Sequence, residues 1–145
     1  MVEVLEGVVI RTVIFCEDVR QEAGNKWSVL GVFSADVIVG VVPAAVRLSL
    51  YIESEVSQPY KGPLDLRLRL ENEEILVANG QLDAQPGITV LPVPQMVVGI
   101  PRGGMLHVDM GIAPDKWVEI GAKRVLVGIF KDGVLTAPTT SQQPS

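Results

Sequence analysis

Residues 13–39, VIFCEDVRQEAGNKWSVLGVFSADVIV, carry the clearest structural signal in this chain. Gly24-Asn25 is a two-residue turn signal, and it lies between two runs that are rich in β-branched and aromatic residues. This pattern predicts a long β-hairpin. If Gly24 and Asn25 form the whole turn, Cys16 lies opposite Phe33 in the hairpin.

The two arms of the predicted hairpin differ in character. The second arm, residues 27–39, is longer than a typical strand, and we expect a bend or bulge at Gly31, where no side chain resists it. The first arm is apolar up to Phe15 and then becomes charged, with Glu17, Asp18, Arg20 and Glu22 before the turn. This change predicts a strand whose far end projects into water. Because a lone hairpin is marginal in water, the rest of the chain must supply a sheet beside it.

The same region resembles a known family. The resemblance is carried by the run CEDVRQE at residues 16–22 and by Gly24, Lys26, Ser28, Gly31 and Val32. These residues are similar to the CE-x-V-x-x-E…GK-x-S-x-x-G-V opening of a family of small bacterial β-sandwich proteins that is catalogued as a domain of unknown function. Asn25, between Gly24 and Lys26, departs from the motif. The last strand, near an Asp-Gly turn, resembles the family too. The resemblance implies a β-sandwich and carries over no catalytic residues.

The rest of the chain continues the β pattern. Turn residues separate further β-prone segments at 46–55, 64–70, 75–82, 88–100, 105–112 and 117–130. No segment shows the 3.6-residue period of an amphipathic helix. The sequence predicts a single all-β domain over residues 1–137, an antiparallel β-sandwich of about eight or nine strands, immunoglobulin-like or C2-like in outline, with a closed β-barrel as the alternative. The polar residues 138–145 are expected to form a disordered tail.

Composition narrows the functional classes. A formal net charge of −5, from 17 acidic and 12 basic residues, argues against a nucleic-acid partner or an anionic membrane surface. A single cysteine excludes an internal disulfide, and the first seven residues do not resemble a signal peptide. These features favour a cytoplasmic protein. The mean hydropathy of +0.34 is high for a domain with 20% charged residues, so part of the apolar surplus is expected at a subunit contact.

Few residues suggest chemistry. Cys16 would need a base such as His107, oriented by Asp109, to act as a nucleophile, but its neighbours are apolar and favour a buried, inert thiol. His107 and Asp109 share one strand face, but a competent metal site needs three or four ligands. The sequence therefore predicts no catalytic residue, no metal site and no cofactor. Acidic residues at the expected hairpin tips leave weak calcium binding open.

The segment 88–100 suggests self-association. It contains no charged residue, and Pro92 and Pro94 restrict it to an edge strand or an extended ribbon, because proline cannot donate to a ladder. We expect Met96, Val97, Val98 and Ile100 to be free to pack on a partner, with the tip of the first hairpin as the other candidate surface.

Two functions follow from these observations. The first is a non-enzymatic protein-interaction or self-assembly module that binds itself, as a homo-oligomer, or another protein. The alternative is a small-ligand binding module that uses loops at one end of the sandwich. Neither nucleic acid nor membrane is expected as a partner.

Overall fold

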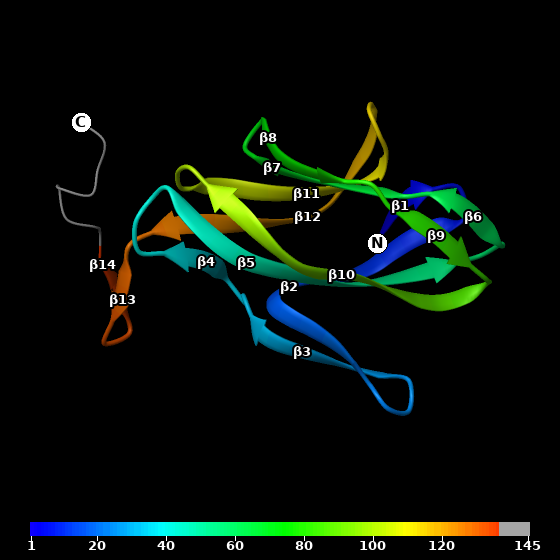
Figure 1. Cartoon of the computed structure of the whole chain (residues 1–145), viewed down its shortest axis with the longest axis horizontal. Helices are drawn as coiled ribbons and strands as arrows, with labels where there is room; N and C mark the ends of the chain where they lie inside the picture. Colours follow the sequence, from blue (N-terminus) through cyan, green and yellow to red (C-terminus); the bar gives the residue numbers. More distant parts are fainter. Residues whose placement is uncertain (137–145) are drawn as a thin grey trace.

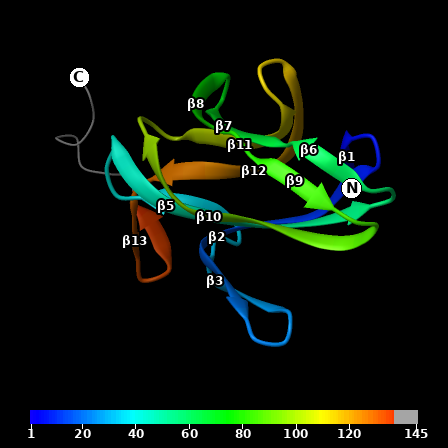
Figure 2. The ribbon, with the colours of Figure 1, turned by 45° about the vertical axis from the view of Figure 1, so that its right-hand side comes forward.

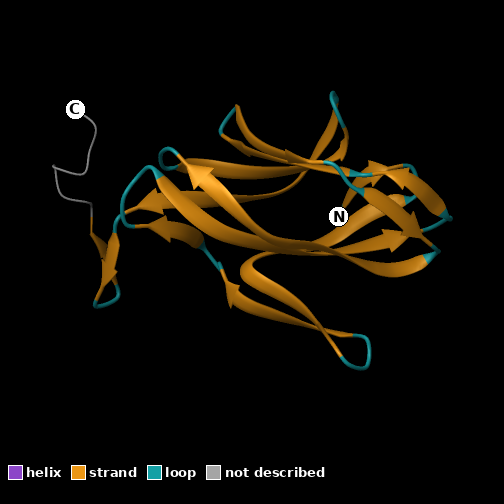
Figure 3. Cartoon of the chain, viewed as in Figure 1, coloured by secondary structure: helices purple, strands orange, loops and turns teal. Residues whose placement is uncertain are grey.

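The computed structural model of the chain describes residues 1–136, and the predicted tail at 138–145 lies outside the described residues. All regular structure in the described part is β-strand, which confirms the all-β prediction (Figure 3). Within residues 1–136, no helix is long and apolar enough to cross a membrane. The strands in chain order are β1 (Val2–Leu5), β2 (Val8–Glu22), β3 (Lys26–Val32), β4 (Asp36–Val39), β5 (Ala44–Val56), β6 (Tyr60–Pro63), β7 (Asp65–Leu70), β8 (Glu73–Ala78), β9 (Gln81–Ala84), β10 (Gly87–Ile100), β11 (Gly104–Ile112), β12 (Lys116–Val127), β13 (Ile129–Lys131) and β14 (Val134–Thr136).

Two five-stranded sheets form the two layers of a β-sandwich, as predicted (Figure 1). The first sheet has the order β1-β2-β5-β10, with β3 added to β2. The second has the order β4-β12-β11-β7-β8, and β6–β9 and β13–β14 form two small sheets. The pairing is antiparallel throughout the described part except between β4 and β12, which are parallel. The predicted antiparallel β-sandwich is confirmed, with this one parallel pair among the described strands.

The described strands outnumber the eight or nine expected. The second hairpin arm and the segment at 75–82 each belong to two strands, and short strands occur before Gly7 and after Gly128. Strand signals in sequence do not show where a β-prone run changes sheet, so the count was too low.

One hydrophobic core lies between the two sheets. The strand alternation predicted for β5 and β7 is confirmed, because both strands bury their leucine positions against each other's layer. Leu50 and Ile52 of β5 and Leu68 and Leu70 of β7 are fully buried. Each such side chain stabilises the fold by about 1.5–3 kcal/mol relative to full exposure. The core therefore fixes the two sheets face to face.

The predicted hairpin exists, but its register differs by one residue. Cys16 lies opposite Val32 and Glu22 opposite Lys26, so the loop has three residues, not two. Gly24 and Asn25 both have positive φ angles, 79° and 58°. The turn signal at these residues was correct, but Ala23 also leaves the ladder. The predicted pairing of Cys16 with Phe33 is therefore wrong.

The second arm does not continue as one strand. Gly31 has a φ of 65°, and a β-carbon there would collide with the Glu17 side chain. The register of β2 and β3 does not shift between Cys16–Val32 and Asp18–Leu30, so Gly31 forms no bulge. The larger change follows at residues 33–35, where the chain leaves the first sheet. It enters the second sheet as β4, which pairs in parallel with β12. Because Val37 and Val39 of β4 are buried, this crossing places apolar side chains of the arm in the core.

The far half of the hairpin projects away from the sandwich. β2 pairs with β5 only from Val8 to Cys16, and beyond Cys16 it pairs with β3 alone. Figure 2 shows the β2–β3 ribbon extending below the two layers. The prediction that the charged end of the first arm leaves the core is confirmed.

Candidate functional site

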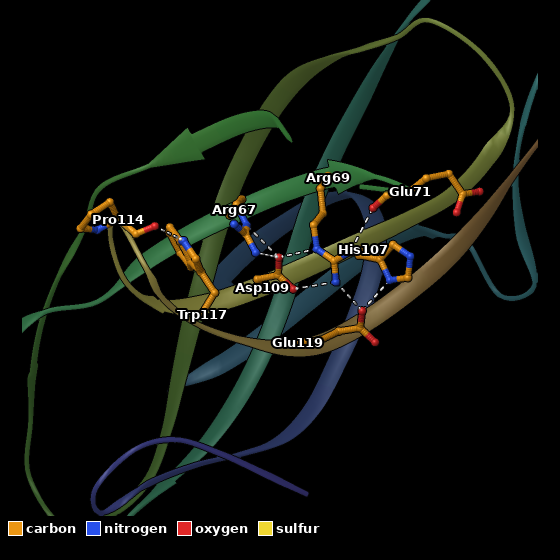
Figure 4. A network of polar contacts seen from close by, with 8 residues as sticks. All are labelled: Arg67, Arg69, Glu71, His107, Asp109, Pro114, Trp117 and Glu119. Carbon is orange, nitrogen blue, oxygen red and sulfur yellow. Dashed lines mark hydrogen bonds and ion pairs between the residues drawn. The ribbon is translucent and has the colours of Figure 1, made fainter. Parts of the chain in front are cut away.

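A network of charged side chains lies on the outer face of the second sheet (Figure 4). We call it the arginine–carboxylate network; its members are Arg67, Arg69, His107, Asp109 and Glu119. Three neighbouring strands supply them: in the ladders, Asp109 of β11 lies opposite Arg67 of β7 and Glu119 of β12, and His107 lies opposite Arg69. Residues two apart share one face of a strand, so this register gathers all five on one surface.

Asp109 is the centre of the network. Its Oδ2 accepts hydrogen bonds from Arg67 Nε at 2.8 Å and Arg69 Nε at 2.7 Å, while only 1% of the residue is exposed. Burial raises the pKa of the Asp109 carboxyl. The hydrogen bonds and charges of Arg69 and Arg67 outweigh burial and hold that pKa below its ordinary value. Asp109 is therefore a stably ionised carboxylate.

Arg69 and His107 make the remaining contacts of the network. Arg69 Nη2 lies 2.9 Å from Glu119 Oε1, and Arg69 Nη1 donates to the Glu71 carbonyl at 3.0 Å. The His107 Nδ1 lies 2.5 Å from the same Glu119 oxygen. The Arg69 guanidinium therefore has protein acceptors on all three of its nitrogens. Its hydrogen bond to Asp109 raises the Arg69 pKa above its ordinary value.

An aromatic side chain covers one end of the network. The Arg67 guanidinium carbon lies 4.9 Å from the centre of the Trp117 ring, which is a cation–π contact. The Trp117 indole donates to the Pro114 carbonyl at 2.8 Å, and this bond holds the ring in place. These ion pairs link β7, β11 and β12, and each charged side chain of the network has a partner within the chain.

Sequence reasoning anticipated only part of this network. His107 and Asp109 do share a face, but His107 pairs with Glu119, and its side chain is 20% exposed rather than free in solvent. The pairing of Arg67 and Arg69 with Asp109 was missed. Arg67 and Asp109 are 42 residues apart, and no local pattern brings them together. Within residues 1–136, no group of three or more His, Cys, Asp or Glu side chains is placed to hold a metal ion.

The environment of Cys16 does not suit a nucleophile. It is fully buried on β2, and its Sγ donates to the Ser49 carbonyl at 3.5 Å. Burial raises the pKa of the thiol. Cys16 belongs to the first sheet, whereas His107 and Asp109 lie on the second, so the structure does not bring these three residues together. The predicted burial of Cys16 is confirmed.

The projecting half of the β2–β3 hairpin is the second candidate surface. Among the described residues, β3 is paired only with β2, so its other edge is open. Leu30 and Val32 are 42% and 51% exposed. We call β3 with its open edge the hairpin surface. It combines unpaired backbone groups with exposed apolar side chains.

The predicted self-association residues on β10 divide into two groups. β10 is an edge strand of the first sheet, as predicted, and its register shifts between Val93 and Met96. Val98 and Ile100 are 2% and 1% exposed because they pack in the core, so they are not free for a partner. Met96 is half-buried, and Val97 is 70% exposed. Of the four residues predicted, only Val97 points fully into solvent.

A cavity opens at the seam between the edges of the two sheets. Its volume is about 250 Å³, and its apolar lining includes Leu66, Leu82, Leu91, Val93 and Met110. Asn79 and Gln81 contribute polar atoms to the lining. This cavity could hold a small apolar group, but it lies beside β10 rather than among the loops at one end of the sandwich.

Comparison with known proteins adds no assignment: no family model matches the chain, and no curated protein matches it in sequence.

Proposed function

We propose that this chain is a non-enzymatic protein-interaction module that binds its partner through the hairpin surface. The observation that supports the proposal is β3 itself, a seven-residue strand paired on one side only within the described residues. Natural edge strands are usually blocked by proline, by several charges or by a covering element. β3 contains no proline and one charged residue, Lys26. Strand addition at such an edge is a common mode of recognition.

The arginine–carboxylate network supports the same assignment. Its charges are already paired with one another, and its central carboxylate is buried under two guanidinium groups. Such a carboxylate can neither accept a proton readily at neutral pH nor reach a substrate. The network stabilises the second sheet, and the interaction surface lies elsewhere.

A site-specific crosslinking experiment tests the proposal. A photoreactive amino acid replaces Leu30 on β3 or, as the matched control, Val77 on β8; these residues are 42% and 39% exposed. After irradiation in a lysate of the source organism, position 30 should give several-fold more protein adducts than position 77. Adducts with a second copy or with another protein both support an interaction module. Equal, low yields at the two positions would contradict it.

The seam cavity supports a second candidate, a binding site for a small apolar ligand. Its volume of about 250 Å³ and its leucine-rich lining suit a short alkyl or aromatic group. A fluorescent naphthalene sulfonate should then bind the wild type and not Val93→Trp, in which the indole fills the cavity. Unchanged binding to Val93→Trp would rule out this cavity as the site.

Two further assignments belong to this proposal. We place the protein in the cytoplasm, on the basis of its single, buried thiol. We also assign it to the bacterial family whose opening motif residues 16–32 resemble. In the structure these motif residues form the projecting hairpin and its loop. The motif therefore coincides with the surface that we propose for interaction.

A further inference from the structure

We infer that the partner of the hairpin surface is a second copy of this chain, and that two β3 strands pair antiparallel about a two-fold axis. This inference rests on the proposed function and specifies the partner. A closed two-fold contact buries the same surface on both copies and leaves no open edge. The pairing would join the two hairpins into one four-stranded ribbon.

The length of β3 determines the register. Full overlap of Lys26–Val32 with its symmetry copy centres on the fourth residue of seven, Val29. Val29 then lies opposite Val29 of the second copy, Ser28 opposite Leu30, and Trp27 opposite Gly31. Residues opposite each other in an antiparallel pair lie on the same face, so these side chains meet.

The pairing of Trp27 with Gly31 brings the indole of one copy to Glu17 of the other. Gly31 has no side chain of its own, but Glu17 of the same copy fills the space over it, so the indole of the second copy meets the Glu17 side chain. The Glu17 side chain lies beside Gly31. Within residues 1–136, neither the Glu17 carboxylate nor the Trp27 indole nitrogen forms a hydrogen bond or ion pair with the protein. In the proposed dimer, the indole N–H of one copy lies beside the carboxylate of the other.

The charge on β3 is also compatible with self-pairing. Lys26 is its single charged residue, and full overlap places it opposite Val32 of the second copy. The two Lys26 residues then lie six residues apart along the ribbon, about 20 Å. This separation exceeds the Debye length of about 8 Å at physiological salt, so their repulsion is screened.

The other sheet edges are less suited to pairing. β10 contains Pro92 and Pro94, which cannot donate to a ladder, and β8 begins with Glu73 and Glu74. β4 and β1 have only four residues each. Among the edge strands of the two five-stranded sheets in residues 1–136, β3 combines length, free donors and exposed apolar side chains.

Sedimentation velocity and disulfide trapping on the purified full chain test the inference. The wild type should sediment as a dimer of about 31 kDa, twice the 15.6 kDa of one chain, at protein concentrations between about 1 and 100 μM. With Val29→Cys, mild oxidation should give a disulfide-linked dimer, because opposite residues of an antiparallel pair have Cα atoms within disulfide range. Val77→Cys, on the edge strand β8, is the control and should remain mostly monomeric.

The register has its own test. A mixture of Ser28→Cys and Leu30→Cys chains should form several-fold more linked dimer than either variant alone, since these positions face each other. A monomeric wild type at 100 μM, with Val29→Cys no more crosslinked than Val77→Cys, would overturn the inference. If photo-adducts from position 30 to a different protein persist in that case, the proposed function stands and only the identity of the partner is wrong.

Discussion

The arginine–carboxylate network and the hairpin surface both lie outside the core. The network pairs its polar groups within the chain, whereas the hairpin surface leaves part of its backbone groups unpaired. In the network, Asp109 is 1% exposed and binds two arginines of its own chain. On the hairpin surface, one edge of β3 is open and Leu30 is 42% exposed. A region that satisfies its own groups stabilises the fold, whereas a region that leaves them open is suited to a partner.

The position of each region in its sheet explains this contrast. β11 has neighbours on both sides, β7 and β12, so a side chain on it meets partners from two strands. β3 has one neighbour and continues past the end of the first sheet. The network should therefore contribute to stability, and the hairpin surface to association.

The largest effect is expected for Asp109→Ala. This change leaves two partly buried arginines without their shared carboxylate, and loss of one partner from a buried ion pair costs about 3–5 kcal/mol of unfolding free energy. Urea denaturation measures it. The control, Glu73→Gln, breaks an exposed pair with Arg102 and should cost at most about 1 kcal/mol. Similar losses for the two variants would show that the network does not stabilise the sheet.

Acid should weaken the network in a defined direction. Because the pKa of Asp109 is lowered in the folded state, its contribution is complete above the ordinary value of 3.8 and is lost as pH falls through the folded pKa. The difference in unfolding free energy between wild type and Asp109→Asn should therefore be constant from pH 7 to about 5. It should shrink once the pH falls below 3.8. A difference that grows on acidification would have the wrong sign for this account.

How much of this contrast could be predicted from the sequence depends on the range of the interactions. Local patterns were sufficient for the all-β class, the projecting hairpin and the edge position of β10. Pairing between distant strands was not predictable, so the Arg67–Asp109 contact across 42 residues was missed. The same limit explains why Val98 and Ile100 were wrongly predicted to be free for a partner. An uncharged run on an edge strand can face either a partner or the chain's own core. The loop at Ala23 shows that even a clear turn signal leaves the register open by one residue.

A smaller loss of stability is expected when Gly31 in β3 gains a side chain. Gly31→Ala places a β-carbon at a φ of 65° and against Glu17, and should cost about 1–2 kcal/mol. Gly40→Ala is the control, since a β-carbon there meets no atom within 4 Å and the φ is ordinary. Thermal unfolding compares the two. Equal stability of both variants would show that the backbone at Gly31 is not constrained.

The smallest effect on stability, with a clear effect on association, is expected for Leu30→Ser. An exposed substitution of this kind changes the unfolding free energy by about 0.5 kcal/mol or less. It should still raise the dimer dissociation constant about tenfold, which corresponds to about 1.4 kcal/mol. Val97→Ser, at a residue 70% exposed on β10, should leave association unchanged. If Val97→Ser alone weakens association, the interface is on β10 and not on the hairpin surface.

Hydrogen–deuterium exchange at two protein concentrations compares the two regions in one measurement. If β3 pairs with a second copy, its backbone amides should exchange more slowly at about 100 μM than at about 1 μM. The amides of β7 and β11, whose ladders are complete within the chain, should exchange at the same rate at both concentrations. Exchange in β3 that is independent of concentration would contradict the central claim that the hairpin surface binds a second copy.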